Sequence, residues 1–69
     1  MKQTVTFLEA YQGGYDECLH GHANGQLGEL PDELADARVN MNNYAANQLN
    51  HHYWRGWAAA IDGLIRQTK

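Results

Sequence analysis

Two short motifs, one near each end of this 69-residue chain, constrain its fold more than any other feature. The first is AYQGGY at positions 10–15, and the second is YWRGW at positions 53–57. On a helix, the missing side chain of glycine lets a second backbone come close, and large neighbouring rings cover the gap. The motifs therefore predict two helices that pack on each other through Gly14, Tyr15, Tyr53, Gly56 and Trp57.

Chain length and cysteine content limit the protein to a single small domain with a thin core. A fold of this size buries only about 60% of the surface that its unfolded chain exposes. Cys18 is the single cysteine, so an intramolecular disulfide is impossible and a reducing compartment is the natural setting. No apolar stretch approaches the roughly 20 residues of a membrane span, and no secretory leader is evident. We expect a soluble cytoplasmic protein, without a membrane partner, in which self-association supplies missing burial.

The charge balance disfavours nucleic acid as a partner. The chain has 5 Lys and Arg residues against 8 Asp and Glu residues, for a net charge of −3. Affinity for nucleic acid depends largely on basic side chains that neutralise phosphates, and these basic residues form no run. They are Lys2, Arg38, Arg55, Arg66 and Lys69. The composition favours a protein partner.

The first helix has a clear start and an unusual glycine content. Thr6 is a candidate N-cap, and Glu9 completes a capping-box pattern with it. Apolar residues at helical spacing then predict a helix over residues 7–23, followed by a glycine-containing loop over 24–30. Each glycine inside the helix costs about 1 kcal/mol relative to alanine. This cost suggests that the glycines are present because they allow close packing.

The remainder of the chain predicts one long second helix over residues 31–66. Pro31 suits the first helical position, and an apolar stripe keeps its register from Leu34 to Leu64 without an interrupting proline. The expected fold is all-α: a two-helix hairpin in which a short first helix packs on a long second helix. The alternative is a break near Asn50–His52, because the asparagines of this region are poor helix formers.

Three parts of the second helix are candidate partner-binding surfaces. The stripe around Met41 and Tyr44, up to Leu49, would be left uncovered by the short first helix, so it predicts a homodimer or another protein partner. Trp54 and Arg55 are residue types enriched at interface hot spots. The acidic start of the helix is explained by the helix dipole, and its functional interpretation is a negative docking patch. Its members are Asp32, Glu33 and Asp36.

One cluster of residue types has the chemistry of a metal site. Thiolate and imidazole are zinc ligands, but the spacing of these residues matches no known zinc pattern. The set consists of Cys18, His20, His22, His51 and His52. A buried thiol with solvated or hydrogen-bonded histidines is the favoured interpretation, without metal or cofactor. Cys18 and His22 as nucleophile and base would lack an orienting carboxylate, so we expect no enzyme activity.

The two motifs resemble the ribosome modulation factor family of small bacterial proteins. The positions that carry the resemblance are Ala10, Gln12, Gly14, Tyr15, Leu19, Gly21, Pro31, Tyr53, Gly56, Trp57 and Ala60. The resemblance implies two helices joined by a loop. It also implies binding to ribosomal RNA, which in that family drives ribosomes into an inactive paired state.

The chain departs from this family in charge and in length. Family members are strongly basic, whereas this chain is acidic, and it has roughly three additional helical turns between Pro31 and Tyr53. Two functional hypotheses follow. The first is a non-enzymatic binding protein, of the small acidic kind typical of phages and mobile elements, that modulates or inhibits a host complex by protein contact. The second is a ribosome-associated hibernation-type factor.

Overall fold

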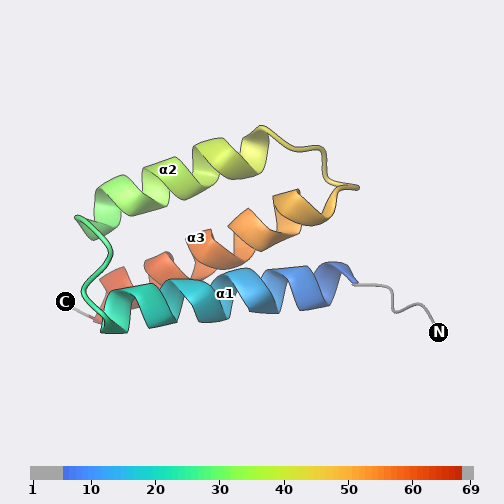
Figure 1. The fold of residues 1–69 in the computed structure, drawn as a ribbon. Coiled ribbons are helices and arrows are strands. Elements are labelled where there is room, and N and C mark those ends of the chain that lie inside the picture. The colour runs from blue at the N-terminus through green and yellow to red at the C-terminus, as the bar shows by residue number, and fades with distance from the viewer. Residues whose placement is uncertain (1–5, 68–69) are drawn as a thin grey trace.

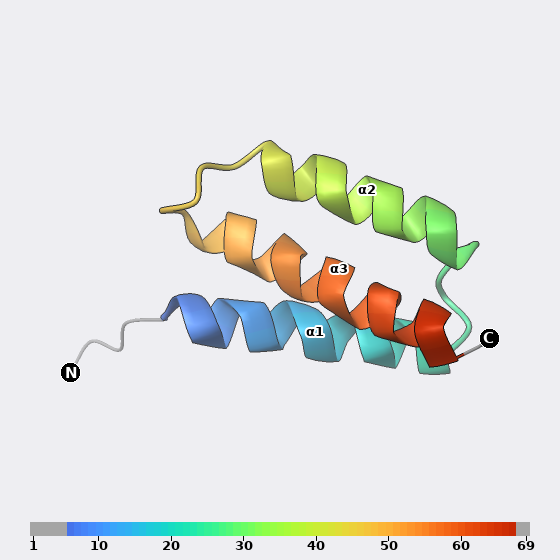
Figure 2. The same cartoon turned by 180° about the vertical axis from the view of Figure 1, so that it is seen from behind.

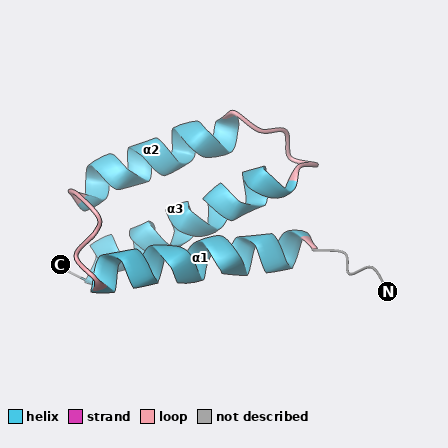
Figure 3. Cartoon of the chain, in the orientation of Figure 1, coloured by secondary structure: helices cyan, strands magenta, loops and turns pink. Residues whose placement is uncertain are grey.

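The computed structural model describes residues 6–67, which form three helices. These are α1 (Phe7–Ala23), α2 (Leu30–Asn42) and α3 (Leu49–Gln67) (Figures 1 and 3). The described residues contain no strand, so the all-α prediction is confirmed. Lys2 and Lys69 lie outside the described residues.

The start and end of α1 follow from local hydrogen bonds. The Thr6 hydroxyl accepts a hydrogen bond from the Glu9 backbone N–H at 3.1 Å, and the Glu9 carboxylate accepts one from the Thr6 N–H at 2.9 Å. This reciprocal pair is the predicted capping box, which is thereby confirmed. At the other end Gly25 has φ +70°, a conformation that glycine adopts without strain, and it turns the chain out of the helix. The predicted bounds 7–23 are therefore confirmed.

The single second helix predicted over residues 31–66 is wrong. Helix α2 ends at Asn42 and α3 begins at Leu49, so the break lies just before the Asn50–His52 position of the alternative. At the end of α2, the Asn43 N–H donates to the carbonyls of Val39 and Asn40 at 3.1 and 3.2 Å, and a turn follows. Asparagine side chains compete with the helical backbone for hydrogen bonds, which makes this segment a low-cost place to stop a helix.

The break lets both halves of the predicted long helix bury their apolar faces. Helix α2 runs antiparallel to α3, whereas α1 and α3 run in the same direction (Figures 1 and 2). Helix α3 lies between the other two. The backbones of α1 and α2 do not approach within 8 Å between Cα atoms, although both pack against α3. Of the stripe that motivated a dimer, Met41 and Tyr44 are half-buried and Leu49 is 40% exposed, and dimerisation stays a proposal.

The core is thin and is shared by all three helices. Among residues 6–67, its four buried hydrophobic residues are Cys18 from α1, Ala37 from α2, and Ala60 and Ile61 from α3. Partly buried side chains surround this cluster, including Leu19, Leu27, Leu30, Leu34, Trp54 and Trp57. None of the helices within residues 6–67 is long and apolar enough to cross a membrane.

Candidate functional site

The two motif glycines lie where α1 crosses α3, and each accommodates the backbone of the other helix. A Cβ atom added to Gly56 would overlap the Tyr11 carbonyl oxygen and come within 2.9 Å of the Tyr15 nitrogen. A Cβ added to Gly14 would overlap the Tyr53 carbonyl oxygen. Backbone atoms cannot move aside as a flexible side chain can, so the observed separation of α1 and α3 requires glycine at both positions.

The crossing has an internal correspondence that the sequence analysis overlooked. Gly56 lies against the carbonyl of Tyr11, which is three residues before Gly14 in α1. Gly14 lies against the carbonyl of Tyr53, which is three residues before Gly56 in α3. Both helices thus carry the pattern Tyr-x-x-Gly-aromatic, at 11–15 in α1 and at 53–57 in α3. The two aromatic residues that end the pattern differ in environment. Trp57 is partly buried against the core, whereas Tyr15 contributes its backbone to the crossing and is 36% exposed.

One exposed surface beside the crossing gathers tyrosine, arginine and polar side chains. The Arg55 guanidinium carbon lies 4.7 Å from the centroid of the Tyr11 ring. The rings of Tyr11 and Tyr15 stack with centroids 6.4 Å apart. A shallow pocket of about 350 Å³ is formed by α1 residues at this place. We call this surface the tyrosine–arginine face, and its members are Tyr11, Gln12, Tyr15, Asp16 and Arg55.

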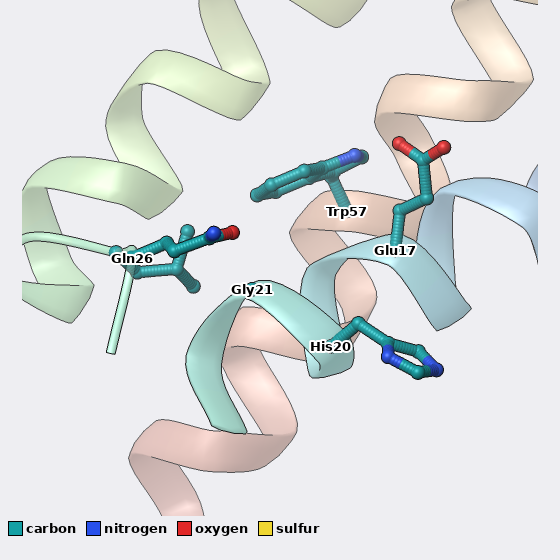
Figure 4. Close-up of a pocket in the computed structure, with 6 residues that line it drawn as sticks. Glu17, His20, Gly21, Gln26 and Trp57 are labelled. Carbon is teal, nitrogen blue, oxygen red and sulfur yellow. The ribbon is translucent and has the colours of Figure 1, made fainter. Parts of the chain in front are cut away.

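A second pocket opens where α1, the loop that follows it and α3 meet (Figure 4). Its volume is about 420 Å³, and we call it the Trp57 pocket. It is lined by Glu17, His20, Gly21, Gln26, Leu27 and Trp57. The indole extends between Gln26 and the Glu17 carboxylate, with its nitrogen at the Glu17 end (Figure 4). The pocket therefore combines an aromatic ring, a carboxylate and an amide.

Tyr53 connects the helix crossing to the Trp57 pocket. Its hydroxyl donates a hydrogen bond to Oε1 of Glu17. Burial raises the pKa of the Tyr53 hydroxyl, the bond to Glu17 raises it further, and the neighbouring Trp57 indole opposes the rise. The indole Nε1 of Trp57 is buried and makes no hydrogen bond of good geometry within the described residues. Tyr53 thus stays protonated at neutral pH and holds the Glu17 carboxylate in place.

The structure separates Trp54 from Arg55, which the sequence analysis had grouped. Arg55 is exposed on the tyrosine–arginine face. Trp54 is half-buried, packs against the core, and meets Tyr53 edge-on at 5.3 Å between ring centroids. It also lies 5.7 Å from the Trp57 ring. Successive residues of a helix point about 100° apart, so these neighbours serve different surfaces.

The acidic start of α2 is also divided by the structure. Asp32 and Asp36 are exposed, whereas Glu33 is half-buried and accepts a hydrogen bond from the Gly28 N–H at 2.9 Å. Glu33 therefore stabilises the loop that precedes α2.

Burial, with a further contribution from the charge of Glu33, raises the pKa of the Cys18 thiol to about 11. The thiol is protonated at neutral pH, which makes it a poor nucleophile.

The adjacent histidines fasten the 43–48 connection to α3. The Nδ1 atom of His51 lies 2.9 Å from the Met41 carbonyl and 3.0 Å from the Tyr44 carbonyl. The Nε2 atom of His52 lies 2.7 Å from the Ala46 carbonyl. Because carbonyls only accept, the ring nitrogens donate in these contacts. Met41, near the end of α2, and Tyr44, in the turn, were predicted to bind a partner, and both are half-buried here.

The other candidate metal ligands lie apart from these histidines. Cys18 is fully buried in the core, and His20 and His22 are exposed in the last turns of α1. Within residues 6–67, no three His, Cys, Asp or Glu side chains gather in a way that could hold a metal ion. The positions of His51 and His52 are explained by the turn that they fasten.

Comparisons with protein families, with curated proteins and with solved structures gave no match to this chain.

Proposed function

We propose that this chain is a non-enzymatic binding protein that acts on a partner complex by protein–protein contact through the tyrosine–arginine face. The observation that carries the proposal is the Arg55 guanidinium held 4.7 Å from the Tyr11 ring beside an exposed Tyr15. Tyrosine and arginine are among the residues that contribute most to protein interfaces. A side chain that is already ordered by a ring contact loses less conformational entropy on binding.

The glycine crossing supports this proposal because it frees aromatic side chains for the surface. Backbone contact at Gly14 and Gly56 holds α1 against α3 without the Tyr15 ring between the helices. The remaining exposed surface also carries large apolar residues, among them Leu8 at 63% and Val39 at 59% exposure. A partner would cover part of this apolar surface. The proposed setting is a chain encoded by a phage or mobile element, whose partner is a complex of the host. A second copy of the chain is included among the proposed partners.

The ribosome-associated alternative rests on the motif resemblance and is disfavoured by the arrangement of charge. Arg55 lies over Tyr11, and Arg66 pairs with Asp62 at 3.1 Å. Such dispersed and partly neutralised cations are a poor match for a phosphate backbone. Ribosomal RNA binding is accordingly the alternative function, and its salt dependence distinguishes it from protein contact.

The test is capture of partners from a host lysate with the wild type and with Arg55→Ala and Tyr15→Ala. We expect both variants to lose a saturable partner while their circular dichroism stays that of the wild type. Arg66→Ala is the matched control, since this arginine is exposed on the same helix but outside the face. Equal capture by all variants would contradict the proposal.

Salt dependence and sedimentation complete the test. An apolar and aromatic interface changes little with ionic strength, whereas phosphate neutralisation weakens steeply. Ribosome capture that disappears with added salt would establish the alternative. Sedimentation equilibrium of the purified chain tests the homodimer, which Tyr15→Ala should dissociate if the face pairs with itself.

A further inference from the structure

We infer that the Trp57 pocket receives a guanidinium group, presented as an arginine side chain by a protein partner. The inference deepens the proposed function and rests on it, because it names the chemistry of a second contact with such a partner. It concerns a surface that the sequence analysis did not single out. Neither Glu17 nor Gln26 belongs to the residues predicted to bind a partner.

The geometry of the pocket suits a flat cationic group. The Glu17 carboxylate lies at one end of the Trp57 indole and Gln26 at the other (Figure 4). The volume of about 420 Å³ accommodates a long side chain. Tyr53 donates to Oε1 of Glu17, which holds the carboxylate in place and leaves Oε2 for an incoming donor. The carboxylate is thus ordered before a ligand arrives, which lowers the cost of binding.

The charge around the pocket is negative. Of the arginines in the described part of the chain, none lines it, and Arg55 and Arg66 have other contacts. The His20 ring points away from the Glu17 carboxylate (Figure 4). An anion would be repelled at this place, and a cation would be attracted.

Guanidinium fits the pocket better than ammonium. It is planar, so it stacks on an aromatic ring, and its fork of N–H donors matches a carboxylate and an amide oxygen. A lysine ammonium is a compact, strongly hydrated point charge, so it would engage Glu17 without stacking on Trp57. We therefore expect arginine to be preferred over lysine, and both over neutral side chains.

The test uses Nα-acetyl-arginine amide as the probe, titrated into the ¹⁵N-labelled protein. The indole Nε1–H signal of Trp57 reports on the pocket directly. We expect saturable binding in the millimolar range, as is reasonable for a single side chain. Nα-acetyl-citrulline amide, which has nearly the same shape without the charge, should bind at least about tenfold more weakly. Nα-acetyl-lysine amide should fall between the two.

Matched variants assign the binding to the pocket. Glu17→Gln keeps an acceptor for the Tyr53 hydroxyl, so the fold should persist, but it should weaken arginine binding about tenfold. Glu29→Gln makes the same change at an exposed residue outside both the Trp57 pocket and the tyrosine–arginine face, and it should leave binding unchanged. Equal binding of arginine and citrulline, or equal loss in both variants, would overturn the inference.

The outcomes separate this site from the proposed function. If arginine does not bind but Arg55→Ala still loses its partner, the pocket assignment fails and the binding function stands. If arginine binds in a Glu17-dependent manner but no partner depends on Arg55 or Tyr15, the tyrosine–arginine face is wrong and the pocket stands.

Discussion

Helices α1 and α2 both pack against α3, but they do so by different means. Helix α1 meets α3 backbone to backbone, at two glycines that leave no room for a single added carbon. Helix α2 meets α3 through side chains such as Ala37 and Leu34, and the turn between them is fastened by His51 and His52. The α1–α3 contact requires that two positions carry no side chain, whereas the α2–α3 contact requires particular side chains. The two contacts should therefore fail under different substitutions.

The largest effect is expected at the α1–α3 crossing. Gly56→Ala places a methyl group on the backbone of Tyr11 and Tyr15, so the helices must separate. We expect a loss of about 2–4 kcal/mol in the free energy of unfolding, measured by urea denaturation. Gly14→Ala should behave in the same way. Gly13→Ala is the control, because a Cβ there has no neighbour within 4 Å, and equal stability of all three variants would refute the crossing.

Alkaline pH should lower the free energy of unfolding through two groups of α1 and α3. Burial raises the pKa of Cys18 to about 11 from 9.0, and that of Tyr53 is also raised. Between pH 9 and 11 the Cys18 thiol of the folded chain retains a proton that the unfolded chain has released. The free energy of unfolding should therefore fall as the pH rises through this range, and Cys18 should account for about 2 kcal/mol of the loss. Cys18→Ala should flatten this pH dependence. An equally steep dependence in that variant would exclude Cys18 as its source.

A smaller effect is expected where α2 is attached. His51→Ala leaves the Met41 and Tyr44 carbonyls without their shared donor, at a cost of about 1–2 kcal/mol. Hydrogen exchange should become faster in α2 while α1 keeps its protection. His22→Ala, at an exposed position of α1, should change stability by no more than about 0.5 kcal/mol. Uniformly faster exchange in both helices would show that the two contacts are not independent.

The smallest predicted change is a gain in stability. Gly63 lies within α3, and a Cβ there would meet no atom within 4 Å. Gly63→Ala should therefore stabilise the fold by about 0.5–1 kcal/mol, since alanine is the better helix former. Thermal denaturation measures the difference. A loss would mean that this face approaches another surface in solution, such as a second copy of the chain.

The sequence predicted those parts of the fold that depend on local signals. Thr6 and Glu9 are close in the chain and determine where α1 begins, so its bounds could be predicted. The break after Asn42 could not be placed, because the apolar stripe keeps its register across the turn. What stabilises the turn is the contact of His51 with carbonyls 7 and 10 residues earlier, which local periodicity does not report.

The candidate sites were only partly predictable for a similar reason. Arg55 was identified from its residue type, but Tyr11, its ring partner, was not, because their contact joins distant parts of the sequence. Glu17 was also missed, since its role depends on the Tyr53 hydroxyl. A signal was present for the crossing: the shared Tyr-x-x-Gly-aromatic pattern marks Tyr11 and Tyr53 as equivalent positions. Residue spacing compared between the two motifs would have shown it.

The central place of α3 has a consequence for synthesis of the protein. Both close helix contacts require α3, which is the last of the three helices to leave the ribosome. Until α3 emerges, the nascent chain therefore lacks the helix against which α1 and α2 pack closely. An isolated helix of the length of α1, with three internal glycines, is marginal in water. Stable structure should consequently form late, in a single step once the tyrosine and glycine of α3 have cleared the exit tunnel.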